Sequence, residues 1–354
     1  MPEFLQERTD LWQYLAGSTK PIVLYGMGNG ADKIMAVLAH YNIKLKAVFA
    51  SDEFVRGHSF KGYHVLKYSD VCRKYTNFIV LVAFGTEKED VISKIVNISK
   101  EQELYVPDVP VVGGGLWNFE YYKTHENEIK RVYDVFEDDI SRKVFEDILN
   151  YKLSGKIKYL QSSASPLVHA YKQILNLGNK ETFLDLGAYT GDTVEEFIEF
   201  MDGYKKIIAL EPDYKNFIKL QKRVMDNKYE NVECYNLGAW HEKDSLFCSA
   251  LAGRNSSLNS KKGKKIAVES VDDLLQGEPV TYIKMDVEGA EKNALIGAKS
   301  TINKFKPKLL VSAYHRNEDI FQLPWLIKEL NPNYHIYLRR HPAIPAWNIN
   351  IYAV

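Results

Sequence analysis

The stretch 182–192, TFLDLGAYTGD, decides which fold we expect for this chain. An apolar run carries Asp185 near its end, Gly187 and Gly191 follow four residues apart, and a helical pattern continues from there. A second apolar run, at 206–211, comes next. A strand, a glycine turn, a helix and another strand are the repeating unit of doubly wound sheets. The pattern predicts a Rossmann-like α/β sheet in this part of the chain.

Five further apolar segments complete this sheet, and we expect seven strands with an antiparallel edge. The five segments are NVECYNLGAW (231–240), VTYIKMDV (280–287), PKLLVSAY (307–314), YHIYLR (334–339) and NINIYAV (348–354).

A smaller α/β unit with the same order of strand, glycine loop, helix and strand is predicted near the N-terminus. The segment PIVLYGMGNGADKIMAVLAHY (21–41) holds a short apolar run, a glycine loop and a helical pattern. Apolar runs at 46–50, 78–84 and 104–106 follow, so about four strands are expected. The segment SFKGYHVL (59–66) resembles the Gly-x-x-Val-Leu turn in nucleotide-binding domains of bacterial sugar-modifying enzymes.

The order of these patterns divides the chain of 354 residues into three parts. We expect a Rossmann-like accessory domain at 1–115, a helical linker region at 116–178 and a larger domain at 179–354. Two folded domains are the usual outcome for a chain of this length.

Composition excludes some classes of protein. Lys plus Arg equals Asp plus Glu at 46 each, which argues against a nucleic-acid partner because such proteins usually carry a basic surplus. No run of about 18 apolar residues occurs, so no membrane span is expected. The start of the chain lacks the pattern of a signal peptide. Cys72, Cys234 and Cys248 have no metal-ligand spacing, and we expect reduced thiols in a cytoplasmic protein.

Acidic residues stand at the ends of the predicted strands. Glu211 follows the glycine loop by about twenty residues, where Rossmann-like sites place an acid that accepts ribose hydroxyls. This feature fits dinucleotide sites as well as methyl-donor sites. YIKMDVEGAE (282–291) adds Asp286, Glu288 and Glu291 at one strand end, and such crowding needs a positive partner. Acids that complement a helix dipole would explain the last two but less well the first.

Together these motifs resemble the FkbM-like methyltransferase family. The resemblance covers roughly residues 179–354, and MDVEGAE is its most specific piece. Further matching strings are LDLGAYTGD, ALEPD, the segment at 236–240, NSSL (255–258), ES-VDDLL (269–275) and SAYHRNEDIFQLP (312–324). The C-terminal NINIYAV departs from the Glu-Thr-x-x-Tyr-Ala string of capsule-related members, which puts the identity of the acceptor in doubt.

The resemblance implies a class I methyltransferase fold, S-adenosyl-L-methionine as cofactor and O-methylation of a sugar, glycan or nucleotide-sugar hydroxyl. It also implies roles for residues of this sequence. Asp185, Gly187 and Gly191 would line the methionine end of the donor, and Glu211 would hold the ribose. The adenine would be bordered by Asn236, Gly238 and Ala239. Near the methyl group and the acceptor would lie Asp286, Glu288 and Glu291.

A hydroxyl acceptor benefits from a general base. His315 is the first candidate because it follows the fifth strand and its ordinary pKa suits the task. Asp286 is the rival base. Tyr314 and Arg316 flank the histidine and would orient the acceptor. No metal site is assigned, although the acidic trio could hold Mg²⁺.

Other motifs leave alternatives open. Gly26, Gly28 and Ala31 with Asp52 meet the spacing of a dinucleotide fingerprint. They would suit an NAD(P)-dependent sugar-nucleotide oxidoreductase, a non-catalytic nucleotide- or donor-binding module, or an accessory domain that binds an acceptor or forms a homodimer.

Two basic segments could bind a phosphate or sugar of the acceptor. One is the loop GRNSSLNSKKGKK (253–265), and the other is the group of Arg339, Arg340 and His341 near Trp347. An ordinary solvated loop and an ordinary sheet edge are the favoured explanations of the two segments.

Overall fold

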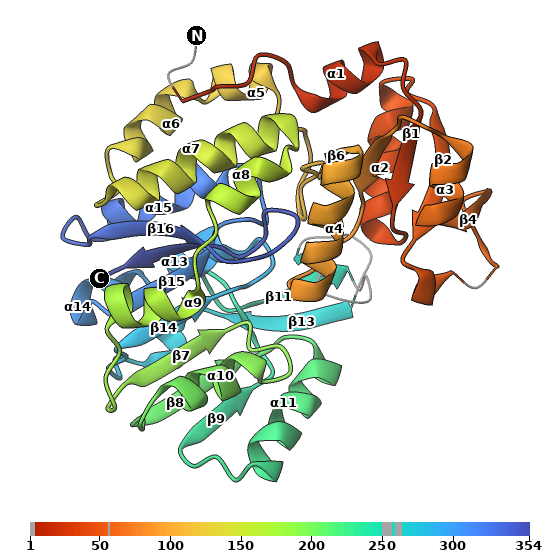
Figure 1. The fold of residues 1–354 in the computed structure, drawn as a ribbon. Coiled ribbons are helices and arrows are strands. Elements are labelled where there is room, and N and C mark those ends of the chain that lie inside the picture. The colour runs from red at the N-terminus through yellow and green to blue at the C-terminus, as the bar shows by residue number, and fades with distance from the viewer. Residues whose placement is uncertain (1–3, 56, 250–256, 259–263) are drawn as a thin grey trace.

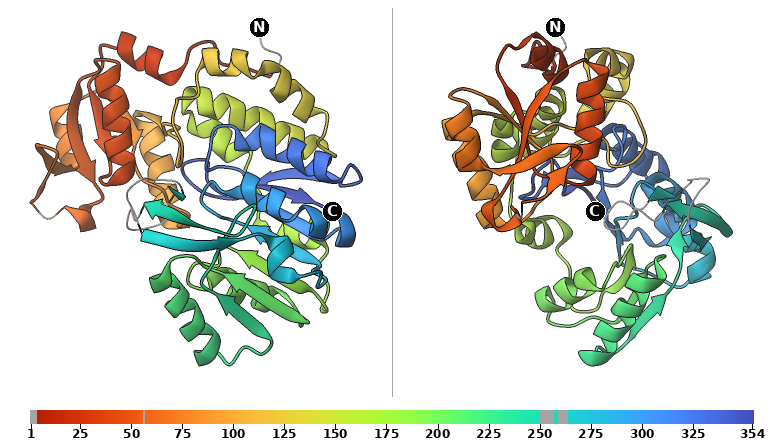
Figure 2. Two further views of the ribbon diagram at one scale, coloured as in Figure 1. Left: turned by 180° about the vertical axis from the view of Figure 1, so that it is seen from behind. Right: turned by 90° about the vertical axis from the view of Figure 1, so that its right-hand side faces the viewer.

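The structure is a computed structural model that describes residues 4–55, 57–249, 257–258 and 264–354. Its strands form a six-stranded, a seven-stranded and a small four-stranded sheet. The six-stranded sheet lies in the N-terminal unit and the seven-stranded sheet in the C-terminal unit (Figure 1). The two larger sheets occupy separate parts of the molecule in both views of Figure 2.

The N-terminal unit is a Rossmann-like α/β sheet, as predicted, with the strand order β3-β4-β2-β1-β5-β6. All pairs are parallel except β3 with β4. Its strands are β1 (Ile22–Tyr25), β2 (Leu45–Ala50), β3 (Ser59–Phe60), β4 (Tyr63–Lys67), β5 (Ile79–Val82) and β6 (Glu103–Tyr105). Its helices are α1 (Leu11–Gly17), α2 (Asn29–His40), the 3₁₀ turn η1 (Asp52–Phe54), α3 (Tyr68–Lys74) and α4 (Glu89–Glu101).

The expectation of only about four strands here was wrong. Residues 59–67 form a hairpin whose tip, Lys61 and Gly62, has φ angles of 48° and 84°. Two consecutive positive φ angles are typical of a tight hairpin turn, so this glycine separates two strands. The segment SFKGYHVL is therefore more than a turn.

Helices fill residues 119–175. They are α5 (Phe119–Thr124), α6 (Glu126–Tyr133), α7 (Asp139–Ser154), α8 (Ile157–Ser162), α9 (Leu167–His169) and the π-helical turn η2 (Ala170–Leu175). Helix α7 starts at Asp138, whose carboxylate accepts the amide of Ser141, and ends at Gly155, which has a φ of 65°. The Ser141 hydroxyl in turn accepts the amide of Leu338 at 2.9 Å. This helical region therefore packs on the C-terminal sheet. Its boundaries at residues 115 and 178 stay a prediction.

The C-terminal sheet has seven strands in the order β16-β17-β15-β14-β7-β8-β9, which confirms the predicted fold class. Strand β17 is antiparallel to both neighbours, and the others are parallel. The strands are β7 (Thr182–Leu186), β8 (Lys206–Leu210), β9 (Val232–Tyr235), β14 (Tyr282–Met285), β15 (Lys308–Ser312), β16 (Ile336–Arg340) and β17 (Ile349–Ala353). The helices are α10 (Asp192–Phe200), α11 (Tyr214–Asp226), α12 (Val271–Leu275), α13 (Glu291–Gly297), α14 (Lys299–Phe305) and α15 (Asp319–Leu330).

The single strand expected over 231–240 is interrupted. After Tyr235 the chain leaves the main sheet, because the Asn236 amide donates to the backbone carbonyls of Glu211 and Pro212 at 2.8 and 3.0 Å. The chain then enters the small sheet, which the sequence did not predict. Its strands are β10 (Gly238–Ala239), β11 (Asp244–Ser249), β12 (Ser257–Leu258) and β13 (Lys264–Glu269). Most of the lysine-rich loop 253–265 lies outside the described residues.

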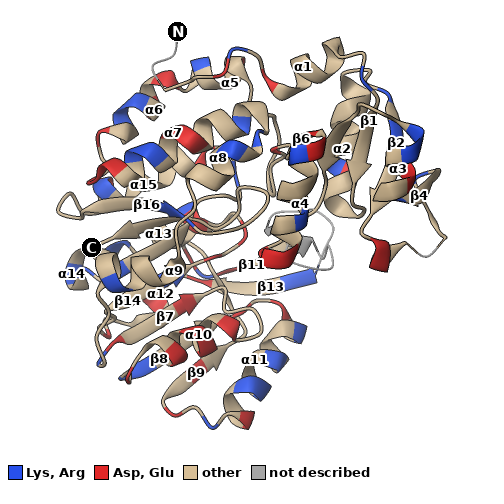
Figure 3. Cartoon of the chain, viewed as in Figure 1, with Lys and Arg blue, Asp and Glu red and all other residues tan. Residues whose placement is uncertain are grey.

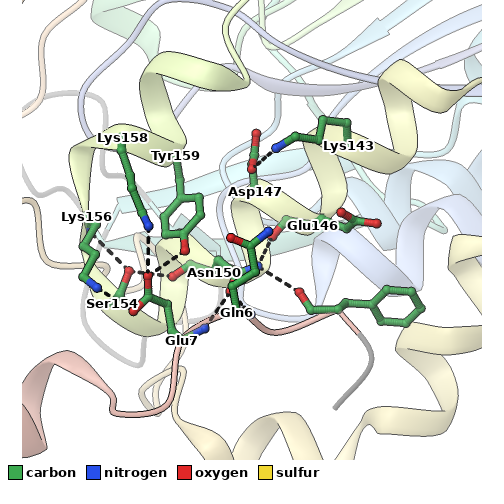
Figure 4. Close-up of polar contacts among 11 residues, drawn as sticks. Gln6, Glu7, Lys143, Glu146, Asp147, Asn150, Ser154, Lys156, Lys158 and Tyr159 are labelled. Atoms are coloured by element: carbon green, nitrogen blue, oxygen red, sulfur yellow. Dashed lines mark hydrogen bonds and ion pairs between the residues drawn. The ribbon is translucent and has the colours of Figure 1, made fainter. Parts of the chain in front are cut away.

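The first residues of the chain cross over to helix α7 (Figure 4). The buried Asn150 amide donates to the carbonyl of Phe4 at 2.8 Å, and its oxygen accepts the amide of Gln6 at 2.7 Å. The Glu7 carboxylate accepts Lys156 and the Tyr159 hydroxyl, both at 2.6 Å. Residues 4–7 therefore tie the N-terminal unit to the helical region.

A second contact joins the two units. Thr86 and Ile344 exchange backbone hydrogen bonds of 2.7 and 2.9 Å. Beside them Trp347 packs so closely on Gly85 that a Cβ atom there would lie 2.0 Å from the indole ring. Trp347 thus packs between the two units.

Charged residues of both signs are spread over both units (Figure 3). Among the described residues, no helix is long and apolar enough to cross a membrane. Cys72 and Cys234 are free thiols, and the side chain of Cys248 lies outside the described part of the chain.

We predict that Asn150→Ala lowers the free energy of unfolding by about 1–3 kcal/mol, because it removes the side-chain hydrogen bonds to the backbone of Phe4, Gln6, Glu7 and Glu146. Chemical denaturation followed by circular dichroism measures this change. Asn303→Ala is the matched control, since Asn303 is exposed and its amide donates to the Lys299 carbonyl of its own helix. Equal stabilities of the two variants would contradict the role of Asn150.

Candidate functional site

A cavity of about 380 Å³ opens at the carboxyl ends of β7, β8 and β14. Strand β7 is the first strand of its sheet and lies between β8 and β14, so the strand order reverses there. Ligands of open α/β sheets bind at such a switch point. Predicted site residues that line the cavity are Gly187, Glu211, Gly238, Ala239, Asp286, Glu288 and Tyr314.

The glycine loop brings the ends of β7 and β14 close together. Gly187 has a φ of 92°, and a Cβ atom on it would lie 2.0 Å from the backbone oxygen of Asp286. Gly191 begins α10 with a φ of 86° and packs against Leu220. Between them Tyr189 has a φ of 48°, which is uncommon for a residue with a side chain. The loop is therefore shaped by backbone conformations that favour glycine.

Glu211 faces the cavity from the end of β8. Its carboxylate accepts the amide of Tyr189 at 2.9 Å and that of Asp213 at 2.8 Å. Burial raises the pKa of Glu211 to about 7 despite these hydrogen bonds. Both carboxylate oxygens are thus fixed in position at the rim of the cavity.

Lys284 is a buried cation that the sequence analysis did not single out. It lies on β14 directly beside Asp185 on β7 in the strand register. Its ammonium group is 3.7 Å from Asp185 and 4.0 Å from Asp286. Burial opposes the charge of Lys284, but the two carboxylates outweigh it and raise the pKa of the amine. A lysine inside the apolar run YIKM was the signal for this residue.

His315 is fully buried among carboxylates. Its Nδ1 atom lies 2.9 Å from Glu291, and its Nε2 atom lies 3.5 Å from Asp286 and 3.6 Å from Glu288. Burial disfavours the imidazolium ion, but these carboxylates raise the pKa of His315 to about 10. At neutral pH both ring nitrogens of the histidine are therefore protonated. The positive charge of the imidazolium ion offsets the negative charges of the three carboxylates.

The acids around His315 have different environments. Burial tends to raise the pKa of Asp286, but Lys284 and His315 outweigh it and lower that pKa. Asp319 lies behind the cluster, where burial and the charge of Glu291 raise its pKa to about 8. Asp286 thus stays ionised at the edge of the cavity.

Some predicted site residues do not line the cavity. Asp185 lies beneath it and accepts a hydrogen bond from Thr193. Asn236 supports the loop before Gly238, and the Nε atom of Arg316 donates to the carbonyl of Gly289 at 2.9 Å. Gly191 and Glu291 also lie behind the cavity wall.

The basic group near the C-terminus is largely structural. Arg339 pairs with Asp138 through two hydrogen bonds, and Arg340 is buried and donates to the carbonyls of Leu160 and Ala343. The interpretation of these arginines as acceptor ligands was wrong, because contacts with the helical region and with nearby carbonyls hold both guanidinium groups. His341 does line the cavity, where burial lowers its pKa to about 4.

Two glycines of the first loop have packing explanations, whereas Gly28 has a φ of 98° and no described atom within 4 Å of an added Cβ atom. A Cβ atom on Gly26 would lie 2.5 Å from the ring of Phe84, and one on Gly30 would lie 2.4 Å from the backbone oxygen of Ala83. Close approach of helix α2 to the sheet therefore explains these two glycines without a bound dinucleotide.

Comparison with known proteins identifies the C-terminal unit. Residues 185–341 match the sequence model described as the methyltransferase FkbM domain. This part of the chain is an FkbM-type methyltransferase domain. The expected family resemblance is thereby confirmed, and the cavity lies inside the matched range except for a few lining residues. A comparison with curated proteins found no match.

Solved structures similar to this chain include another FkbM protein. Methyltransferase FkbM from Methylobacillus flagellatus KT is 21% identical, with a TM-score of 0.72 over 96% of this chain and 91% of that chain. Both units of the fold therefore occur together in that protein. Fibrillarin from Aeropyrum pernix, solved with S-adenosyl-L-methionine, is 14% identical and covers 55% of this chain and 74% of its own, with a TM-score of 0.34.

We predict that Gly187→Ala lowers the free energy of unfolding by about 2–4 kcal/mol, because the new methyl group meets the Asp286 carbonyl at a positive φ. Thermal unfolding measures the loss. Gly114→Ala is the control, since Gly114 has an ordinary φ and no atom within 4 Å of the added carbon. A wild-type melting temperature for Gly187→Ala would show that the loop is not as tightly packed as described.

Proposed function

We propose that this protein is an S-adenosyl-L-methionine-dependent methyltransferase that methylates a hydroxyl group of a sugar, glycan or nucleotide sugar. The observation that carries the proposal is the cavity at the switch point of an FkbM-type domain, with the Glu211 carboxylate on one side and Asp286 on the other. In this cavity Glu211 can accept hydrogen bonds from the ribose of the donor, and Asp286 can face its cationic sulfonium group.

We assign the parts of the donor to positions in the cavity according to the order of the strands. Glu211 accepts the two ribose hydroxyls, and Gly238 and Ala239 border the adenine on the loop that Asn236 supports. The methionine end lies along Gly187, which Gly191 supports from behind the cavity wall. Lys284 lines the cavity there, and Asp185 lies beneath it. Only a glycine allows the approach at Gly187, because the Asp286 carbonyl occupies the space of a side chain.

The acceptor is assigned to the opposite part of the cavity. Ser312, Tyr314, Asn348 and Asn350 line it there with neutral hydrogen-bonding groups. His341 also lines it, but its two ring nitrogens pair with Ser165 and Tyr352, and burial keeps the ring in its neutral form. Neutral donors and acceptors suit a polyhydroxylated molecule such as a sugar. Glu288 lies beside this region, whereas Glu291 and Arg316 support it from behind.

The reaction is an in-line displacement. The acceptor oxygen forms a bond to the methyl carbon while the carbon–sulfur bond breaks, and S-adenosylhomocysteine leaves with the electron pair. The acceptor's proton passes to a base, for which the sequence proposed His315 or Asp286. We assign it to Asp286, because Asp286 reaches the cavity whereas His315 is protonated and buried behind it. Positioning of the two reactants supplies much of the rate, since the sulfonium is already activated.

The charge balance and the cysteines bear on the protein's partner and its location in the cell. The balanced charge supports a small-molecule or glycan acceptor over a nucleic acid. The free thiols of Cys72 and Cys234 support a cytoplasmic location. We also propose that the protein forms a homodimer in which the N-terminal accessory units of the two subunits contact each other.

Donor binding is the first test. Isothermal titration should show micromolar binding of S-adenosylmethionine and S-adenosylhomocysteine but not of NAD(H). Glu211→Ala should weaken donor binding by about 1–3 kcal/mol, the scale of lost hydrogen bonds to a charged group. Glu233→Ala, on the neighbouring strand β9 and outside the cavity, should bind as the wild type does. Binding of NAD(H) alone would move the chemistry to the N-terminal loop.

We further predict that donor affinity falls with pH below about 7. Burial raises the pKa of Glu211 to about 7, so the ionised form that accepts both ribose hydroxyls is present above this pH and is lost below it. The dissociation constant should rise by up to about ten-fold per pH unit between pH 7 and pH 5. Titrations of wild type and Glu211→Gln across this range measure the effect. An equally steep change in the variant would assign it to another group.

A further inference from the structure

The Nε2 atom of the buried His315 ring faces two carboxylates without a hydrogen bond to either. His315 has no exposed surface, and its Nε2 atom makes no hydrogen bond to any residue that the structure describes. Two carboxylate oxygens face this nitrogen, at 3.5 Å from Asp286 and 3.6 Å from Glu288. Both distances are too long for hydrogen bonds. A buried polar atom without a close partner is costly and needs an explanation.

The surrounding chain fixes these groups in place. Glu291, at the start of α13, contacts Nδ1 at 2.9 Å and accepts the amides of Val287 and Gly289 at 3.0 and 3.4 Å. It therefore orients the imidazole so that Nε2 points away from it, toward Asp286 and Glu288. Glu288 sits in a left-handed conformation with a φ of 53°. Such strained residues cluster at functional sites.

This arrangement has the chemistry of a metal site. Metal-binding histidines commonly offer one ring nitrogen to the ion and the other to a carboxylate, which is the pairing of His315 with Glu291. Bonds of about 2.1 Å in a tetrahedral site would place neighbouring ligand atoms about 3.4 Å apart. The spacings from Nε2 to the two carboxylates are close to this value.

We propose that His315 Nε2, Asp286 and Glu288 bind one divalent transition-metal ion, such as Mn²⁺ or Zn²⁺, which displaces the proton from Nε2, and that Glu291 is a positioning residue for the histidine. One nitrogen and two carboxylate oxygens suit these ions better than Mg²⁺, which prefers an all-oxygen shell. Asp286 and Glu288 line the cavity, so the ion would keep one coordination position open toward it. Catalytic metal sites have this open position.

The role of the ion rests on the proposed function. The acceptor hydroxyl would occupy the open position, and coordination would lower its pKa. Its proton passes to the Asp286 oxygen that the ion does not use. The resulting oxygen attacks the methyl carbon, the carbon–sulfur bond breaks and S-adenosylhomocysteine leaves. Binding of the ion itself does not depend on this chemistry and is measured without donor or acceptor.

The test is a titration of chelator-treated full-length protein with MnCl₂, followed by electron paramagnetic resonance, and with ZnCl₂, followed by equilibrium dialysis. We expect one ion per chain in the wild type. Glu288→Gln and Asp286→Asn should weaken binding at least ten-fold, and Glu291→Gln should weaken it about ten- to hundred-fold. The Glu288 side chain is 27% exposed, so its substitution opens no cavity in the core.

Glu196→Gln is the matched control, because Glu196 is another carboxylate of the same cavity outside the cluster. Its affinity for the ion should equal that of the wild type. Absence of a bound ion, or equal affinities in wild type, Glu288→Gln and Asp286→Asn, would overturn the metal site. Donor titration on the same samples separates the metal site from the proposed function. If the protein binds the donor but no ion, the proposed methyltransferase function stands and only the metal site is overturned.

Discussion

The site depends on one buried lysine. Lys284 lies in the strand register beside Asp185, and its ammonium group reaches both Asp185 and Asp286, at 3.7 and 4.0 Å. Removing one partner of a buried ion pair leaves the other charge without compensation, at a cost of about 3–5 kcal/mol. The ion pairs therefore fix how the ends of β7 and β14 meet, and both the glycine loop and the acidic cluster are built on those ends.

Much of the fold could be predicted because its strands are local apolar runs. The β-α-β patterns around 21–50 and 182–211 indicated the positions of both sheets, and the alternation of strands and helices indicated their parallel order. The hairpin at 59–67 was missed because its strands are short and half exposed. The small sheet was missed because β13 begins with two exposed lysines and buries only Ile266 and Val268.

The candidate site was predictable where a residue follows a strand directly. Gly187, Glu211 and Asp286 could be placed because the carboxyl ends of parallel strands share one edge of the sheet. The structural use of Arg339 and Arg340 could not be predicted, because their partners come from residues 138 and 160 in a helical region far along the chain. The sequence also could not show which predicted site residues line the cavity and which lie behind its wall, because tertiary packing decides this.

The crossing of residues 4–7 onto helix α7 has a consequence for the order of biosynthesis. Residues 4–7 leave the ribosome before Asn150, which lies 146 positions beyond Phe4. The strands of the N-terminal unit can pair while later residues are still being translated, since the strands of that sheet all lie before residue 106. Residues 4–7 must then wait, unattached, until α7 emerges from the exit tunnel. Nascent chains stopped before this helix would expose residues 4–7 to proteases, and longer ones would protect them.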